Sequence, residues 1–157
     1  MLVAARHLAP PGVVIELFGG IGKLPFFNSD LESEQLPQQV AAFRSAIGAA
    51  DGLLISSPEY ARGVSGVMKN ALDWLVGSQE FPGKPVALIN TSPRATDALA
   101  ALTLTLETMS SVIVRDASIT LPLLGTANDA ESIAANPELA EPLRHAIAKF
   151  VSAIADR

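Results

Sequence analysis

The chain has 157 residues, of which 49% are hydrophobic and 17% are charged, and its formal net charge at pH 7 is −5. This composition excludes a disordered, highly charged chain, and the negative sign argues against binding to a nucleic-acid backbone. The absence of cysteine excludes disulfides, thiol nucleophiles and cysteine-ligated metals. The length is typical of one domain, so we expect residues 1–157 to form a single domain.

Neither a membrane span nor a secretory signal is predicted. No apolar run approaches the ~18 residues that a membrane helix needs. Arg6 and His7 lie inside the first apolar stretch, whereas a secretory signal places its positive charge ahead of the apolar run. We therefore expect a soluble, cytoplasmic protein with no membrane partner.

Short apolar runs alternate with longer segments of helical periodicity. Helices are predicted at 1–9, 37–50, 65–76, 95–109 and 137–155. Strands are predicted at 13–17, 53–55, 86–89 and 112–114, and the last has a possible extension to 119. Strands that are separated by helices imply right-handed crossovers and a parallel sheet covered on both faces. The sequence therefore predicts an α/β domain with three α/β/α layers and a doubly wound parallel sheet.

Ligands of such sheets bind at the carboxyl ends of the strands, which here precede the loops 18–30, 56–64, 91–94 and 120–128. The first loop contains Gly19-Gly20-Ile21-Gly22-Lys23, which invites comparison with a phosphate-binding loop. A Walker loop requires glycine and Ser or Thr where this chain has Leu17 and Leu24. A flexible connection is the better interpretation of this loop.

The loop after the second predicted strand is the most informative. Pro58 fixes a turn there, and Ser65 is placed to cap the next helix. Main-chain N–H groups and the ring of Tyr60 would then lie at the ligand edge, where a planar heteroaromatic ligand could use both. In the alternative interpretation, Tyr60 covers the core margin and Glu59 is a solvated charge. The neighbouring loop carries the Ser92 hydroxyl at the same edge, which favours a shared pocket.

Acid–base machinery is scarce in this sequence. We find no paired carboxylates and no Ser-His-Asp arrangement, and the two histidines, His7 and His145, have no metal-ligand spacing. If the chain is an enzyme, a cofactor is expected to carry the reaction.

Three motifs together carry a family resemblance. They are Ser57-Pro58-Glu59-Tyr60, then Gly66 with Lys69-Asn70-Ala71-Leu72-Asp73-Trp74, then Phe81-x-Gly83-Lys84-Pro85-Val86-Ala87. The combination resembles the flavodoxin-like NAD(P)H-dependent FMN reductases, a family that includes quinone, azo-dye and chromate reductases. The resemblance implies a flavodoxin-like fold, FMN as cofactor and NAD(P)H as reductant. The electron acceptor would be a quinone, an azo compound, a metal oxyanion or a free flavin.

The resemblance also implies a set of site residues. Pro58, Glu59 and Tyr60 would wrap the edge of the isoalloxazine, mostly through backbone groups. Ala61 stands where the family usually has asparagine and keeps only a main-chain contact, and Ser92 matches a second flavin-contacting position. No catalytic side chain and no metal are implied. Because family members form dimers or tetramers, we expect a homodimer or homotetramer, with the helix that bears Asp73 and Trp74 at the contact.

The N-terminus departs from the family pattern. The family begins with a central strand and a Gly-Ser-x-Arg-x-x-Ser-x-Asn-like loop that holds the FMN phosphate, and we expect this chain to lack both. Three explanations account for this departure. The start codon is assigned too far downstream, the chain is a degenerate gene product, or the protein is shortened and re-pairs its sheet. The functional alternative is a non-catalytic flavodoxin-like remnant that serves as an interaction module without cofactor.

Overall fold

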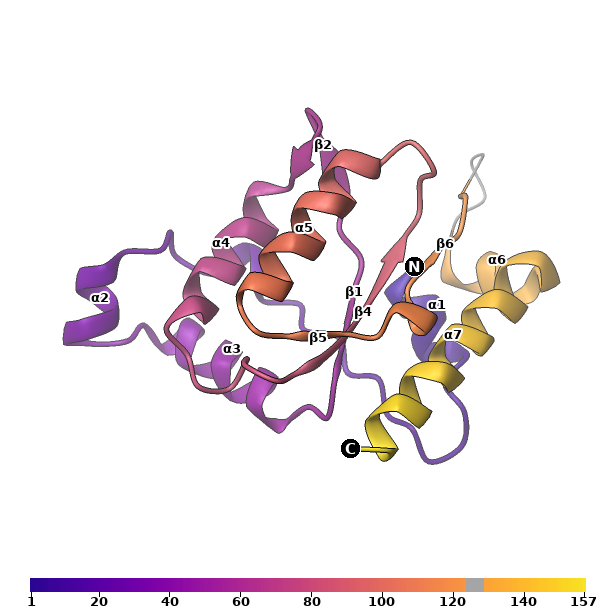
Figure 1. Ribbon diagram of the computed structural model, residues 1–157, viewed down its shortest axis with the longest axis horizontal. Helices are drawn as coiled ribbons and strands as arrows, with labels where there is room; N and C mark the ends of the chain where they lie inside the picture. The colour runs from indigo at the N-terminus through magenta and orange to yellow at the C-terminus, as the bar shows by residue number, and fades with distance from the viewer. Residues whose placement is uncertain (124–128) are drawn as a thin grey trace.

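The computed structural model describes residues 1–123 and 129–157 (Figure 1). Its helices are α1 (Leu2–His7), α2 (Ser29–Glu34), α3 (Gln38–Ala49), α4 (Gly66–Val76), α5 (Thr96–Thr108), α6 (Ala130–Ala135) and α7 (Pro137–Ala155), with 3-10 turns η1 (Ile21–Lys23) and η2 (Arg115–Ala117). Its strands are β1 (Leu53–Ile55), β2 (Glu59–Tyr60), β3 (Gly63–Val64), β4 (Pro85–Asn90), β5 (Val112–Ile113) and β6 (Ile119–Thr120). No helix among these residues is both long and apolar enough to cross a membrane.

The central strand of the described sheet is β4, all six residues of which are buried. It pairs in parallel with β1 on one side and with β5 and β6 on the other. Its continuous apolar run matches the prediction of a parallel strand covered on both faces. The parallel α/β sheet predicted from the sequence is thus confirmed.

Helices cover both faces of this sheet. Successive side chains of β4 point to opposite faces, so its buried residues need cover on both sides. Val86 and Leu88 of β4 belong to a core cluster shared with α3, α4 and α5. Ile89, on the opposite face, packs into a second cluster with α1, α6 and α7. The two helical layers lie on either side of the strands in Figure 1, which confirms the three-layer architecture.

The prediction of a strand at 13–17 is wrong. Alternate residues of this segment are exposed, as in a half-buried strand, with Val14 81% exposed and Ile15 packed on the second cluster. A strand needs a partner for its N–H and C=O groups, and the segment pairs with no strand among the described residues. Among the strands of the described residues, β1 likewise pairs only with β4.

Two other segments differ from the prediction. The connection 18–30 is not simply flexible, since it contains η1 and the start of α2. The predicted strand at 112–114 does not run through to 119, because η2 separates β5 from β6. At this interruption the Leu88 N–H donates to the Ser118 hydroxyl (3.1 Å), which replaces a backbone acceptor.

Candidate flavin-binding site

The loop after β1 forms a short antiparallel hairpin at the carboxyl end of the sheet. Tyr60 pairs with Gly63 across the two-residue turn Ala61–Arg62. Both turn residues adopt the left-handed conformation, with φ of 49° and 59°, as type I′ hairpin turns require. Neither is glycine, so this turn carries backbone strain of a kind that is common at functional loops.

Side chains attach this hairpin to the first turn of α5. Glu59 Oε2 accepts a 2.8 Å hydrogen bond from the Ala98 N–H. The Arg62 guanidinium lies 3.4 Å from the Asp97 carboxylate in an exposed ion pair. Glu59 is therefore not the merely solvated charge of the alternative interpretation.

The loop after β4 is organised by Asn90, which is buried with 7% exposure. Its Nδ2 donates to the carbonyl oxygens of Ser92 (2.7 Å) and Ala95 (3.4 Å) and to the Thr120 hydroxyl (3.4 Å). Its Oδ1 accepts from the Ser92 N–H (3.2 Å). A buried amide with this many partners holds the loop in one conformation.

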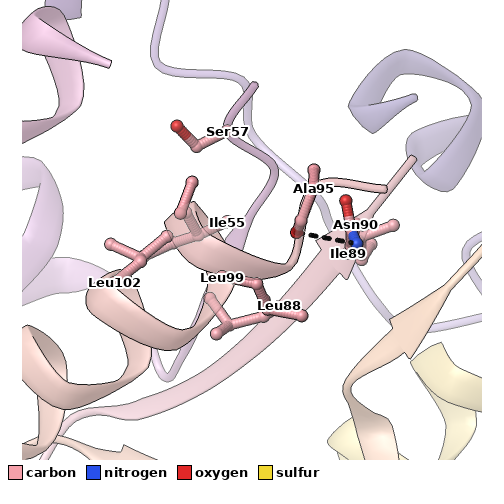
Figure 2. A pocket seen from close by; sticks show the side chains of 9 residues that line it. Ile55, Ser57, Leu88, Ile89, Asn90, Ala95, Leu99 and Leu102 are labelled. Carbon is pink, nitrogen blue, oxygen red and sulfur yellow. Dashed lines mark hydrogen bonds between the residues drawn. The ribbon is translucent and has the colours of Figure 1, made fainter. Parts of the chain in front are cut away.

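The two loops meet around a small pocket between β1, β4 and α5 (Figure 2). Ser57 from one loop and Asn90 and Ala95 from the other line it, above the apolar floor of Leu88 and Leu99. Its free volume is about 10 Å³, which is room for roughly one water molecule. A tricyclic ligand does not fit inside, so it would have to lie on the outside, across the two loops.

The residues expected to contact flavin lie on these two loops. Pro58, Tyr60 and Ala61 are exposed on the hairpin, and Tyr60 as a whole is 67% exposed. Glu59 and Ser92 are half-buried. The Ser92 hydroxyl accepts from the Arg94 N–H (3.3 Å), so it is directed toward its own loop.

Sequence reasoning missed one side chain and one contact that build the site. It gave no role to the side chain of Asn90, although an asparagine directly after a buried strand is itself a signal of a fixed turn. It also missed the contact between Glu59 and Ala98. These residues are 39 positions apart, and no local pattern connects them.

The helix α4, which carries the second motif, holds the long connection 18–30 in place. The Trp74 indole N–H (2.8 Å) and the Asn70 amide (3.0 Å) both donate to the Pro25 carbonyl. The Phe27 N–H donates to Asn70 Oδ1 (2.9 Å), and the Phe27 ring meets Trp74 edge-on at 5.0 Å. Trp74 is fully buried within its own chain, so its side chain serves packing rather than a subunit contact.

Other chemistry is sparse in the described part of the chain. No group of three or more His, Cys, Asp or Glu that could hold a metal ion occurs there. Residues 124–128 of the predicted loop 120–128 lie outside the described residues. The pKa of Asp129 is lowered by hydrogen bonds from the backbone and hydroxyl of Ser132, but this carboxylate caps α6.

The parallel sheet, its two helical layers and the paired loops at the ends of β1 and β4 define a flavodoxin-like α/β protein. A solved structure of the flavoenzyme NAD(P)H:(acceptor) oxidoreductase FerB from Paracoccus denitrificans is similar, with a TM-score of 0.84 and 29% identity. That similarity covers 99% of this chain and 87% of the other. The sequence model of the family described as NADPH-dependent FMN reductase matches residues 1–123. The chain belongs to this family.

Curated relatives match a shorter segment. An NAD(P)H-dependent FMN reductase from Pseudomonas aeruginosa is 44% identical over 93 residues, which are 58% of this chain and 50% of that protein. A 2-hydroxy-1,4-benzoquinone reductase from Burkholderia sp is 45% identical over 92 residues, or 57% of this chain and 49% of that protein. The chain thus spans about half the length of these relatives.

Proposed function

We propose that this chain is a flavin-dependent oxidoreductase that uses FMN as cofactor and NAD(P)H as reductant. The observation that carries the proposal is that the segments following β1 and β4 meet at Ser57, Asn90 and Ala95 in a member of the FMN reductase family. When bound, FMN supplies hydride acceptance from the nicotinamide and electron delivery to an acceptor. The protein's task is then to bind and orient, which suits a chain poor in acid–base groups.

The donors on the loop after β1 fit the flavin ring. Within the described residues, the backbone N–H groups of Ser57 and Ala61 donate to no acceptor, so they are available to a ligand's carbonyl oxygens and ring nitrogens. The exposed ring of Tyr60 offers an aromatic face beside them. We propose that Pro58, Glu59, Tyr60, Ala61 and Ser92 form this part of the binding site, chiefly through their backbone.

The proposed electron acceptor is a small molecule of the quinone type, with azo compounds, metal oxyanions and free flavin as further candidates. Two relatives support the quinone class, since the names of the Burkholderia protein and of a Pseudomonas putida protein describe quinone reductases. An acceptor would approach from the open side of the loops, because the pocket beneath them is too small. The negative net charge argues against a nucleic-acid partner, because phosphate backbones are also negative.

We further propose a single-domain, cytoplasmic protein that forms a homodimer or homotetramer. Apolar side chains on and beside α4 support the oligomer. Phe26 is 91% exposed although its neighbours Pro25 and Phe27 are held by α4, and Val67 and Val76 are 48% and 66% exposed. Exposed apolar groups on a fixed backbone are typical of interfaces. The alternative, a module that binds no cofactor, has no support in the family match.

The test is acceptor-dependent oxidation of NADH and NADPH by the purified chain with FMN supplied, followed by nicotinamide absorbance with 1,4-benzoquinone as acceptor. We expect turnover that requires protein and FMN together and that falls in Tyr60→Ala. An exposed substitution on the opposite helical layer, Glu138→Gln, is the control. A folded chain that adds nothing to the rate of FMN alone would overturn the proposal.

A further inference from the structure

The first turn of α5 receives its hydrogen-bond acceptor from a distant residue. The first N–H groups of any helix have no acceptor within the helix, and a Ser, Thr, Asp or Asn at the N-cap normally supplies one. The N-cap of α5 is Ala95, which makes no side-chain cap. Glu59 accepts from the Ala98 N–H instead. An acidic group at this end also interacts favourably with the helix dipole.

The same helical turn also supports the second loop of the site. Ala95 closes the loop that follows β4, and its carbonyl accepts from the Asn90 amide. The Ala95 N–H in turn donates to the Ser92 carbonyl (3.1 Å). The start of α5 is therefore a common base for both loops. The Ser92 loop is joined to it covalently and through Asn90, and the hairpin is joined to it through Glu59.

The hairpin has one other polar side-chain contact with this base, the ion pair of Arg62 and Asp97. The Arg62 side chain is 86% exposed and that of Asp97 is 48% exposed, and exposed pairs of this kind contribute little. Glu59 is half-buried, and its bond is charge-assisted and short. Of the two contacts, Glu59 thus provides the stronger attachment.

We propose that Glu59 is a positioning residue, whose carboxylate fixes the hairpin that carries Pro58, Tyr60 and Ala61 relative to the Ser92 loop. The inference rests on the proposed function, in which both loops bind one flavin. In it, the Glu59 side chain binds α5, while the Glu59 backbone lies at the ligand edge. Two loops that are held at a fixed separation before binding lose less conformational entropy when the ligand arrives.

The test compares three substitutions at this position, Glu59→Gln, Glu59→Asp and Glu59→Ala. The Gln amide oxygen can accept the Ala98 N–H, whereas the Asp carboxylate keeps the charge on a shorter side chain that does not reach it. Arg62→Ala is the matched control, since it removes only the exposed contact. Amide hydrogen exchange of Ala98 and of the hairpin is measured without ligand, and FMN affinity by flavin fluorescence.

We expect Glu59→Ala and Glu59→Asp to speed exchange at Ala98 and in the hairpin, and to raise the Kd for FMN about tenfold. Glu59→Gln should restore most of the protection and affinity, and Arg62→Ala should change both less than about twofold. Unchanged exchange in Glu59→Asp and Glu59→Ala would overturn the proposal. So would loss of affinity in Glu59→Gln with Ala98 still protected, because the carboxylate would then act on the flavin itself.

The exchange measurement separates this inference from the proposed function. If the wild-type chain does not bind FMN, the proposed function fails. Exchange at Ala98 and in the hairpin still shows whether Glu59 joins the two loops. If both loops stay protected without the Glu59 carboxylate, the inference fails whether or not FMN binds.

Discussion

The indole N–H of Trp74 donates a 2.8 Å hydrogen bond to the carbonyl oxygen of Pro25, which lies 49 residues earlier in the chain. Asn70, one turn before Trp74 on α4, donates to the same oxygen. The long connection before α2 is thereby fixed to the helix that follows the β2–β3 hairpin. Two residues of the second motif, Asn70 and Trp74, therefore stabilise the fold, whatever they contribute to binding.

Trp74→Phe tests this attachment. The substitution keeps an aromatic ring against Phe27 but removes the indole N–H and leaves space in a fully buried position. We expect the free energy of unfolding to fall by about 1–3 kcal/mol, measured by urea denaturation. Gln79→Ala, in the exposed turn after α4, should change it by less than about 0.5 kcal/mol. A Trp74→Phe protein as stable as the wild type would contradict the role we give to this bond.

Asn90→Asp tests how the Ser92 loop is held. The carboxylate can still accept from the Ser92 N–H, but it cannot donate to the carbonyl oxygens of Ser92 and Ala95, which it would instead repel. We expect a loss of about 1–3 kcal/mol in the free energy of unfolding at neutral pH, together with weaker FMN binding. The loss should shrink in acid, because a protonated carboxyl can donate again. A loss that is the same at every pH would argue against the donor role.

Ala61→Gly tests the strain of the hairpin turn. At φ 49° an alanine Cβ is unfavourable and glycine is not. We expect Ala61→Gly to raise the free energy of unfolding by about 0.5–1 kcal/mol, measured by thermal or urea denaturation. The matched control is Ala42→Gly in the exposed interior of α3, which should lower it by about 1 kcal/mol. Destabilisation by both substitutions would show that the turn is not strained in solution.

The cap of α6 predicts a dependence on pH. Hydrogen bonds from Ser132 lower the pKa of Asp129 in the folded chain. Its stabilising contribution is therefore present above the unfolded pKa and is lost as the pH falls through the folded pKa. We expect the difference in unfolding free energy between the wild type and Asp129→Asn to decrease over that acidic range. A difference that does not vary with pH would contradict a charged cap.

Much of the architecture could be predicted from the sequence because buried parallel strands and long amphipathic helices have strong local patterns. The predicted helix 137–155 has the same bounds as α7, and the predicted strand 86–89 lies within β4. The segment 13–17 has the alternation of a strand, but a strand also depends on a partner that the pattern does not contain. The two-residue strands of the hairpin are too short to leave a periodic signal.

The candidate site could be predicted only as a pair of loops. Chain order and the rule for strand ends indicated that the Tyr60 turn and the Ser92 loop share one edge. The contacts that join them, Glu59 with Ala98 and Asn90 with Ala95, depend on side-chain directions and on the docking of α5. Pattern reasoning cannot supply either, nor can it supply the bond that the Ser92 hydroxyl accepts from its own loop.

We propose that the hairpin and the Ser92 loop together bind FMN. The decisive experiment titrates FMN into the purified chain and follows flavin fluorescence, with circular dichroism to show that the chain is folded. We expect saturable binding that is weakened by Tyr60→Ala and by Glu59→Ala. A folded chain that shows no saturable change in flavin fluorescence would contradict it.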